Sequence, residues 1–400
     1  MSTPSLLNIP YLYKAGTLYS QIPESGAGDF TVSRTTTVAN RSTRINKDGF
    51  IETVLDNVPR LDYPVGGAVN GCPALLVEPS AQNLLQRSEE FNDGYWSKSF
   101  GNVTQDQTTA PNGLTTADKY VVTNGQPPNS PIIRSFSFAI NTTYTLSLFV
   151  KKADYDTASI RLNTTETGLL TNSFNLASGT ATNNQIQNYG NGWYRVWVSF
   201  TTAATVTNGQ VQLIRDAQVR DGVAGIFIWG VQLELGSVPT SYIPTTTAAV
   251  TRSAETITNT TASALIGQSE GTIYWDIAAV GGVLTGTGNP QFGVRNSAFT
   301  NWIGLTSNGV SNPFRITAQA TTGALINYQA NITSGKAALA WSSAGLVLYV
   351  NGISVATSAT NPNFSFSRVD IIGLMTFKAN AFELHPNRLT NAQLATLTAL

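Results

Sequence analysis

A stretch of alternating side chains past the middle of the chain places the strongest constraint on the fold. Residues 226–235 read IFIWGVQLEL, in which successive side chains fall on opposite sides of an extended backbone. One side carries Phe227, Trp229, Val231 and Leu233, and the other carries Ile228, Gly230, Gln232 and Glu234. A period of two residues is typical of a β-strand with one buried face. Gly236 and Pro239 end the segment, and we expect it to be the last strand of a β-sandwich.

The same period recurs along the chain and indicates an all-β protein. Residues 192–200 read GWYRVWVSF, and the face predicted to be core carries Tyr194, Val196, Val198 and Phe200. The opposite face carries Trp193, Arg195, Trp197 and Ser199. Only 12% of residues are charged, about half of the typical share, and most other polar residues are Thr, Asn, Ser and Gln. Threonine favours strands and asparagine favours turns, so the composition agrees with many short strands joined by turns.

The distribution of these patterns divides the chain into four parts. Residues 1–71 show little regular periodicity, and we predict an irregular region that anchors the protein and supports oligomerisation. Residues 72–247 carry strands at the spacing of a β-sandwich, and residues 270–400 carry those of a second sandwich. Residues 248–269 are rich in Thr, Ala and Ser, and we predict a linker between the two sandwiches. The isolated charges of this linker are Arg252 and Glu255.

Short motifs predict two turns and one helix. Asn351-Gly352 is the strongest hairpin signal, because a type I′ turn needs a positive φ at both central residues. The sequence NKDG at 46–49 is a second turn signal. Near the C-terminus, Thr390 can cap a short helix.

Several stretches carry similarity to known families. They are DFTVSRTTTVANRSTRINKDGFIETV (29–54), NVPRLDY (57–63), CPALLVEPSAQNLLQRSEEF (72–91) and WGVQLELGSVPTSYIPTTT (229–247). In this order they resemble bacteriophage fibre and tail proteins that contain a jelly-roll domain similar to carbohydrate-binding modules. AALAWSSAGLVLYVNGISVATS and the C-terminal FELHPNRLTNAQLATLTAL resemble the central hairpin and the closing strand and helix of concanavalin-like, laminin-G-type lectin domains.

The charge balance argues against two classes of partner. The chain has 23 Lys and Arg residues and 23 Asp and Glu residues, without a basic run. Electrostatic binding to nucleic acid or to an anionic membrane is therefore not expected. No segment approaches the roughly 18 apolar residues of a membrane span. Residues 1–10 lack the basic start and apolar core of a secretory signal, which weighs against a secreted enzyme.

The residue types give little support to catalysis, and we expect no enzyme activity. His385 is the only histidine, and no G-x-S-x-G motif supplies a nucleophile for it, so we expect it at the surface or at an interface. Cys72 is expected to be a small buried apolar residue and not a nucleophile. A glycosidase needs two carboxylates on either side of the sugar, and no motif pairs any of the carboxylates here. Glu89 and Glu90 read as a solvated turn.

Metal ligands are also scarce. One histidine and one cysteine do not suffice for a zinc site of the usual type. Calcium takes oxygen ligands, and Asp154 and Asp156 in the turn KKADYDT are weak candidates for a structural Ca²⁺. No other cofactor is expected.

Aromatic side chains are the candidates for glycan binding, since the apolar faces of sugar rings stack on aromatic rings. The first sandwich offers Trp96, Tyr189, Trp193 and Trp197, and the second offers Trp302 and Trp341. Most tryptophans of a β-sandwich belong to its core, so burial is the alternative for each of them.

The resemblance and these residues lead to one functional hypothesis. We expect a bacteriophage virion structural protein, a head- or tail-attached fibre or appendage subunit that presents lectin-like domains to host-surface or environmental glycans. Residues 1–71 would contact other proteins of the capsid or tail and hold a homo-oligomer, for which the analogy with fibres favours a trimer. Two alternatives are a purely structural virion decoration protein without ligand binding and a secreted carbohydrate-active enzyme.

Overall fold

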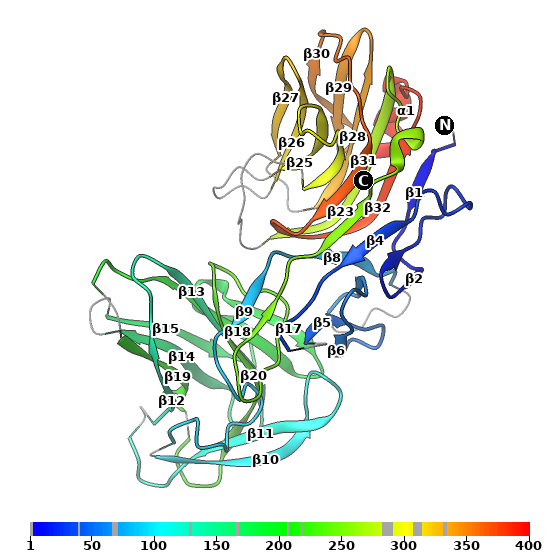
Figure 1. Cartoon of the computed structure of the whole chain (residues 1–400). Helices are drawn as coiled ribbons and strands as arrows, with labels where there is room; N and C mark the ends of the chain where they lie inside the picture. The colour runs from blue at the N-terminus through cyan, green and yellow to red at the C-terminus, as the bar shows by residue number, and fades with distance from the viewer. Residues whose placement is uncertain are drawn as a thin grey trace.

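The computed structural model shows an all-β protein with two β-sandwiches, which confirms the fold class expected from the sequence (Figure 1). The two sandwiches form the lower and the upper lobe of Figure 1, and the strands between them are short. The structure describes residues 3–38, 41–65, 71–98, 100–127, 130–164, 168–205, 208–217, 219–281, 291–306, 314–330 and 334–400.

The first sandwich consists of two antiparallel sheets from the central part of the chain. The six-stranded sheet has the order β10 (Gly101–Thr109), β11 (Thr115–Val122), β20 (Gly225–Leu235), β13 (Thr143–Lys152), β18 (Trp193–Thr201) and β17 (Ile186–Gly190). The five-stranded sheet has the order β12 (Ile132–Ser137), β19 (Asn208–Arg215), β14 (Thr157–Thr164), β15 (Gly168–Asn175) and β16 (Thr180–Ala181). Apolar side chains from both sheets form a common core. We call one face of the six-stranded sheet the outer face, namely the face that points away from this core.

Strand β18 follows the alternation expected from the sequence. The side chains that contribute to the core of the first sandwich are Tyr194, Val196, Val198 and Phe200. On the outer face, Trp193 packs in a separate apolar cluster, and the Arg195 guanidinium lies 5.3 Å from the centroid of the Phe149 ring of that cluster. The strand therefore has two buried faces, and its outer face is covered by another part of the chain.

Strand β20 departs from the predicted alternation at Gly230. Its φ is +61°, and the pairing of β13 with β20 shifts register beside it, between Ser147 and Phe149. The outer-face cluster holds Phe227 and Trp229, whereas the core holds Val231 and Leu233. The prediction that these four side chains share one face is thus wrong. The reason is a β-bulge, which glycine permits because a Cβ at this position would lie 2.9 Å from the Phe149 ring.

The second sandwich also consists of two antiparallel sheets. The eight-stranded sheet has the order β30 (Ile353–Ser358), β29 (Gly345–Val350), β28 (Gly335–Ser342), β23 (Gly271–Gly281), β32 (Thr376–His385), β8 (Ala74–Val77) and β7 (Arg60–Asp62), and β1 (Leu6–Asn8) also pairs with β32. The nine-stranded sheet has the order β2 (Tyr13–Lys14), β3 (Thr17–Leu18), β4 (Phe30–Ser33), β22 (Thr256–Asn259), β31 (Arg368–Ile372), β24 (Phe292–Arg295), β25 (Trp302–Thr306), β26 (Phe314–Ala320) and β27 (Gly323–Ala330). One apolar core fills the space between the two sheets.

The chain ends in helix α1 (Asn391–Thr398), which forms as expected from the sequence. The Thr390 hydroxyl accepts the backbone N–H of Gln393, and the Gln393 side chain accepts the backbone N–H of Thr390, so both donors of a capping box are satisfied. The predicted hairpin turn at Asn351-Gly352 is also present, with φ values of +49° and +83°. In the part of the chain that the structure describes, no helix has the length and apolar character needed to cross a membrane.

Strand pairing does not follow the order of the chain. Strands β1 and β4 from residues 1–71 pair with β32 and β22, which lie more than two hundred residues later. The blue N-terminal strand β1 of Figure 1 therefore lies beside the red strand β32 of the second sandwich. From the sequence, residues 1–71 are predicted to be an irregular anchoring region, because they are too sparse in apolar runs to form a core of their own. That same shortage explains why their strands instead complete the sheets of the second sandwich.

Two shorter elements connect the sandwiches. The hairpin of β5 (Ser42–Ile45) and β6 (Ile51–Val54) lies outside the large sheets, and Ile45 and Ile51 pack against Trp193 and Trp229 on the outer face. Within the predicted linker, β21 (Val250–Arg252) pairs with β9 (Ala81–Asn83). The first sandwich is thus inserted between two parts of the second, and the N-terminal segment contacts both.

Removal of residues 1–71 is expected to unfold the second sandwich. The segment supplies five buried apolar side chains to its core: Leu6, Leu18, Phe30, Val32 and Leu61. Each contributes about 1.5–3 kcal/mol, so their combined loss is comparable to the whole stability of a domain, about 5–15 kcal/mol. Thermal denaturation followed by near-ultraviolet circular dichroism should show a cooperative transition of the second sandwich in the full chain and none in a chain that begins at Cys72. The same transition in both chains would contradict the pairing described here.

Candidate functional site

A cleft of about 450 Å³ lies where the two sandwiches and the β5–β6 hairpin meet. One wall is the outer face, from which Tyr189 of β17 and Trp197 of β18 line the cleft. The hairpin supplies a second wall with Ile45 and Ile51. The segment 238–242 after β20 and the adjoining ends of β8 and β32 close the remaining sides. Residues from four distant parts of the chain thus form one cavity.

The structure divides the six aromatic candidates into two groups. Tyr189 and Trp197 are half-buried and line the cleft. The side chains that are buried in apolar clusters or below the surface are Trp96, Trp193, Trp302 and Trp341. The indole N–H groups of Trp96 and Trp193 donate to main-chain carbonyls at 3.0 and 2.9 Å, which fixes both rings inside the first sandwich. Of the six candidates, Tyr189 and Trp197 are therefore the two rings that line this cleft.

Buried hydrogen bonds hold the segment 238–242 against the outer face. The Arg195 guanidinium donates to the Thr240 carbonyl at 2.7 Å and to the Ser147 hydroxyl at 2.9 Å. The backbone N–H and the hydroxyl of Thr240 donate to the Glu234 carboxylate at 2.9 and 2.7 Å. Burial raises the pKa of Glu234, although Arg195 and these hydrogen bonds oppose the shift. This side of the cleft is accordingly fixed in place before any ligand binds.

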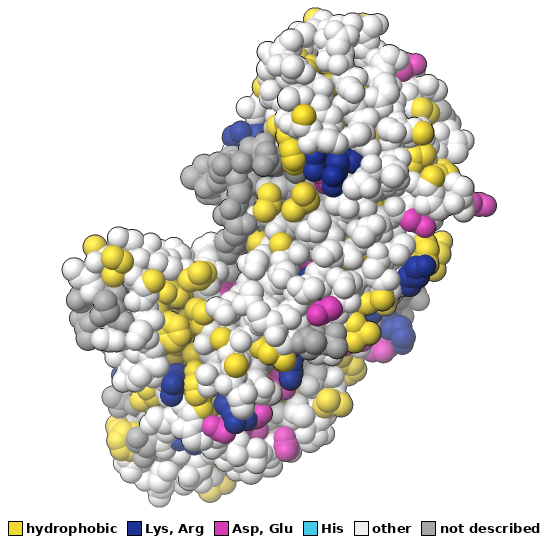
Figure 2. All heavy atoms as spheres, in the orientation of Figure 1, with side chains coloured by type: hydrophobic (Ala, Val, Ile, Leu, Met, Phe, Trp, Pro, Cys, Tyr) yellow, Lys and Arg dark blue, Asp and Glu magenta, His cyan; other side chains and the backbone are white. Residues whose placement is uncertain are grey.

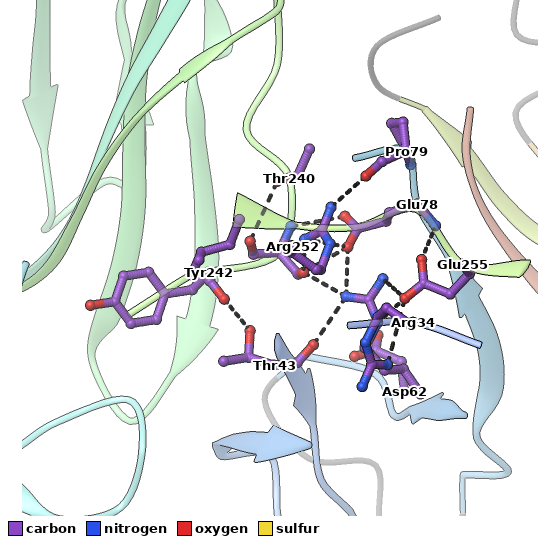
Figure 3. A network of polar contacts seen from close by, with 12 residues as sticks. Arg34, Thr43, Asp62, Glu78, Pro79, Thr240, Tyr242, Arg252 and Glu255 are labelled. Carbon is purple, nitrogen blue, oxygen red and sulfur yellow. Dashed lines mark hydrogen bonds and ion pairs between the residues drawn. The ribbon is translucent and has the colours of Figure 1, made fainter. Parts of the chain in front are cut away.

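A buried network of three arginines and two glutamates lies next to the cleft (Figure 3). Arg60 is its centre, with guanidinium nitrogens 2.6 Å from carboxylate oxygens of both Glu78 and Glu255. Arg252 lies 3.0 Å from Glu78, and Arg34 lies 3.6 Å from Glu255. Arg34 and Arg60 come from the N-terminal segment, Glu78 directly follows β8, Arg252 ends β21, and Glu255 directly precedes β22. The network therefore joins strands that are distant in the sequence.

Neutral groups connect this network to the walls of the cleft. The backbone N–H and the hydroxyl of Ser241 donate to the Glu78 carboxylate at 2.8 and 2.6 Å. Arg60 donates to the carbonyl of Thr43 in the hairpin at 3.2 Å and to the Ser241 hydroxyl at 2.7 Å. Ser241 and Thr43 both line the cleft, so the network fixes two of its walls relative to each other.

The protonation equilibria of the network reflect its burial and its surplus of positive charge. Burial alone would raise the pKa of Glu78, but Arg252 and Arg60 outweigh it and hold that pKa below its ordinary value. Burial and the neighbouring charge of Arg60 lower the pKa of Arg34 to about 10. Burial also lowers the pKa of Arg252. Glu78 interacts with Arg60 and Arg252, and Glu255 interacts with Arg60 and Arg34, so each carboxylate has two arginine partners.

The role of these charges is not evident from the sequence alone. Arg252 and Glu255 are expected to be isolated charges of a linker, but both are buried. The partner of Glu255 is Arg60, 195 residues earlier in the chain. One feature of the sequence could have identified Arg252 and Glu255 as candidates for a buried ion pair: they lie in a segment with few other charged residues. Their pairing, however, depends on a long-range fold that periodicity does not specify.

Three further expectations about single residues are wrong. His385 is buried, not at the surface, with its Nε2 3.1 Å from the Glu383 carboxylate. Cys72 is exposed and lies just before the buried strand β8. Glu89 is not part of a solvated turn, since it is half-buried and accepts a hydrogen bond from the Tyr242 hydroxyl at 3.0 Å, and burial raises its pKa.

The predicted calcium ligands have separate partners. Asp154 lies 2.6 Å from the Lys119 ammonium and accepts the backbone N–H of Gly225 at 2.9 Å. Asp156 lies 3.2 Å from the Lys152 ammonium. In the ranges that the structure describes, no group of three or more His, Cys, Asp or Glu side chains is arranged to hold a metal ion. A structural Ca²⁺ at this pair stays a prediction.

Comparisons with known proteins do not assign this chain to a family. No protein-family model and no curated protein matches the sequence. The chain is similar to the CBM22-1–CBM22-2 tandem domain of Xyn10C from Paenibacillus barcinonensis, with 10% identity over 76% of this chain and 97% of that chain and a TM-score of 0.26. It is also similar to the tandem CBM51 modules of Sp3GH98 from Streptococcus pneumoniae, with 8% identity over 77% of this chain and 100% of that chain and a TM-score of 0.22. A third similar structure is that of domains LG4-5 of the mouse laminin alpha1 chain, with 11% identity over 73% of this chain and 89% of that chain and a TM-score of 0.22. Similarity at this level assigns no ligand or activity to this chain.

Substitution of Glu78 by Gln is expected to weaken the junction in a pH-dependent way. Removal of one partner from a buried ion pair costs about 3–5 kcal/mol at neutral pH. Because the folded-state pKa of Glu78 lies below its ordinary value of 4.5, its charge stabilises the fold above that value, and this contribution is lost as the pH falls towards the folded-state pKa. Urea denaturation at several pH values should show a difference between wild type and variant that is largest at pH 7 and shrinks below about pH 4.5.

Glu52→Gln provides the matched control. Glu52 pairs with Arg44 at 2.6 Å, but its side chain is 36% exposed, so its loss should change the free energy of unfolding by no more than about 1 kcal/mol. Equal effects of the two substitutions at pH 7 would contradict a structural role of the buried network.

Proposed function

We propose that this chain is a glycan-binding subunit of a bacteriophage virion, part of a head- or tail-attached fibre or appendage. The binding part of the proposal rests on one observation, the two half-buried rings of Tyr189 and Trp197 in a cleft of about 450 Å³. Sugar rings stack on aromatic faces, and a concave site of this size can bury most of a small ligand. The virion part rests on the resemblance of the sequence to phage fibre and tail proteins.

Polar groups next to the two rings support a sugar as the ligand. Gln187 of β17 is exposed and lines the cleft beside Tyr189. The Thr376 side chain also lines the cleft, with its hydroxyl oxygen buried beneath the surface. The Gln187 amide can both donate to and accept from sugar hydroxyls. The visible face of the molecule has few charged side chains and is largely uncharged (Figure 2), which suits contact with glycans.

We also propose that the cleft binds glycans without cleaving them. The carboxylates that line it are Asp62 and Glu78. Asp62 lies 2.5 Å from the Lys378 ammonium and accepts the backbone N–H of Ile45 at 2.7 Å. Arg252 and Arg60 hold the pKa of Glu78 below its ordinary value even though burial opposes this. A glycosidase needs a carboxylic acid that keeps its proton near neutral pH, and the lowered pKa of Glu78 disfavours this role for Glu78.

The N-terminal segment is the proposed contact with other subunits. Tyr11 and Leu12 are 53% and 49% exposed, and Ile9 and Tyr13 beside them are also exposed. Clustered exposed apolar side chains are typical of interaction surfaces. We propose that this segment holds a homotrimer and contacts capsid or tail proteins, so that several weak glycan sites act together.

Substitution of Trp197 by Ala is expected to abolish most glycan binding. Loss of a central aromatic contact costs about 2 kcal/mol or more, which weakens binding at least about tenfold. Tyr189→Ala should have a similar effect. A glycan array would identify a ligand of the wild-type protein, and isothermal titration would then compare the variants.

Phe100→Ala is the control, since Phe100 is an exposed aromatic residue of the first sandwich outside the lining of the cleft. This variant should bind as tightly as the wild type. Unchanged binding by the Trp197 variant would exclude the cleft as the site. A wild-type protein that binds no glycan on the array but attaches to phage particles would favour the purely structural decoration role.

The mass of the protein in solution tests the proposed assembly. Light scattering should give three times the chain mass of 42.6 kDa for the wild type. Replacement of the exposed Tyr11 and Leu12 by Ser should lower the mass to that of a monomer without a change in the melting temperature. A monomeric wild-type protein would contradict a trimer formed by this chain alone.

A further inference from the structure

A second cavity of about 280 Å³ lies beside the cleft. It is lined by Lys151 and Trp193 on the outer face, by Asn191 in the turn between β17 and β18, and by Phe50 at the end of the β5–β6 turn. Tyr189 lines both cavities. The two spaces are therefore separated by little more than one aromatic side chain.

The register of β17 and β18 orders the residues of the two cavities along one line. Gln187 pairs with Arg195, and Gly190 pairs with Trp193, so Tyr189 lies between these two pairs. Trp193 and Trp197 lie on the same face of β18, four residues apart, which corresponds to about 13 Å at the rise of a β-strand. This span is longer than one sugar ring. The same hairpin of β5 and β6 covers both cavities, with Ile45 over the cleft and Phe50 at the second cavity.

Lys151 gives the second cavity a positive charge. Its side chain is half-buried, and its ammonium lies 5.9 Å from the centroid of the Trp193 ring. The nearby Lys119 and Lys152 pair with Asp154 and Asp156. Within the described ranges, by contrast, no carboxylate lies within ion-pair distance of Lys151. A half-buried lysine that lacks a carboxylate partner is suited to an anionic group of a ligand.

The acidic groups nearest to the two cavities are already engaged. Asp62 pairs with Lys378, and Glu78 pairs with Arg60 and Arg252. Glu52 and Asp48, which lie on the covering hairpin, pair with Arg44 and Lys47. An anionic ligand in the two cavities would therefore contact cations and carboxylates that are already paired with a Lys or Arg side chain. Its negative charge would not face an unpaired carboxylate among these residues.

We propose that the two cavities form one extended groove for an acidic oligosaccharide. In this groove an acidic group of the sugar chain, a carboxylate, sulfate or phosphate, binds the Lys151 ammonium, and neighbouring sugar rings lie against Tyr189 and Trp197. The inference rests on the proposed glycan-binding function and adds two properties to it. The groove selects acidic glycans over neutral ones, and it needs more than one sugar unit.

The test compares Lys151→Gln with its matched neighbour Lys152→Gln. The probe is an array on which each uronic-acid, sialic-acid, sulfated or phosphorylated glycan is printed beside its neutral counterpart, in lengths from one to six units. The wild type should prefer acidic members, and affinity should rise from the monosaccharide to chains long enough to span both cavities. Loss of a charge-assisted hydrogen bond should weaken acidic-glycan binding by about tenfold or more in Lys151→Gln and not in Lys152→Gln.

The possible results separate this inference from the function on which it rests. Binding of the neutral counterparts should be equal in wild type and Lys151→Gln, which also shows that the variant is folded. Equal binding of acidic and neutral glycans, or an unchanged affinity of Lys151→Gln for acidic ones, would overturn the extended acidic groove. If Trp197→Ala still abolished binding in that case, the proposed glycan-binding function would stand. A wild-type protein that binds no glycan of the array would overturn both.

Discussion

The buried contact of Arg60 with Glu78 and Glu255 is the interaction on which the rest of the structure depends. Removal of these charges from water is costly, and the cost is offset only because both carboxylates meet more than one arginine and several neutral donors. The residues that satisfy one another come from the N-terminal segment, from the end of β8 and from the segment between β21 and β22. The network can therefore form only when these parts are in place together.

The position of this network explains why the cleft exists. The two sandwiches would otherwise be joined by short strands alone, and such connections leave neighbouring domains free to move. Ser241 and Thr43 tie the segment after β20 and the β5–β6 hairpin to Glu78 and Arg60. A cavity with fixed walls results, and a site that is already formed loses less entropy when a ligand binds. The rings of Tyr189 and Trp197 lie on the wall that this arrangement leaves accessible.

Local features of the fold were predictable from the sequence, and long-range features were not. The alternation in β18, the Asn351-Gly352 turn and the Thr390 cap depend on neighbouring residues, and all three are present. The bulge at Gly230 was missed because periodicity assumes an uninterrupted ladder. Tryptophan content indicated possible sugar contacts, but burial decides which rings are accessible. Burial depends on how the N-terminal strands and hairpin fold back onto both sandwiches, which no local pattern specifies.

The most direct measurement is a crystal structure of the full chain with a bound glycan, chosen by array screening. We expect sugar density in the cleft, with one ring against Trp197 and another against Tyr189, and with the Arg60 network unchanged from the free protein. Density on another surface, such as the exposed face of the five-stranded sheet, with an empty cleft would contradict it.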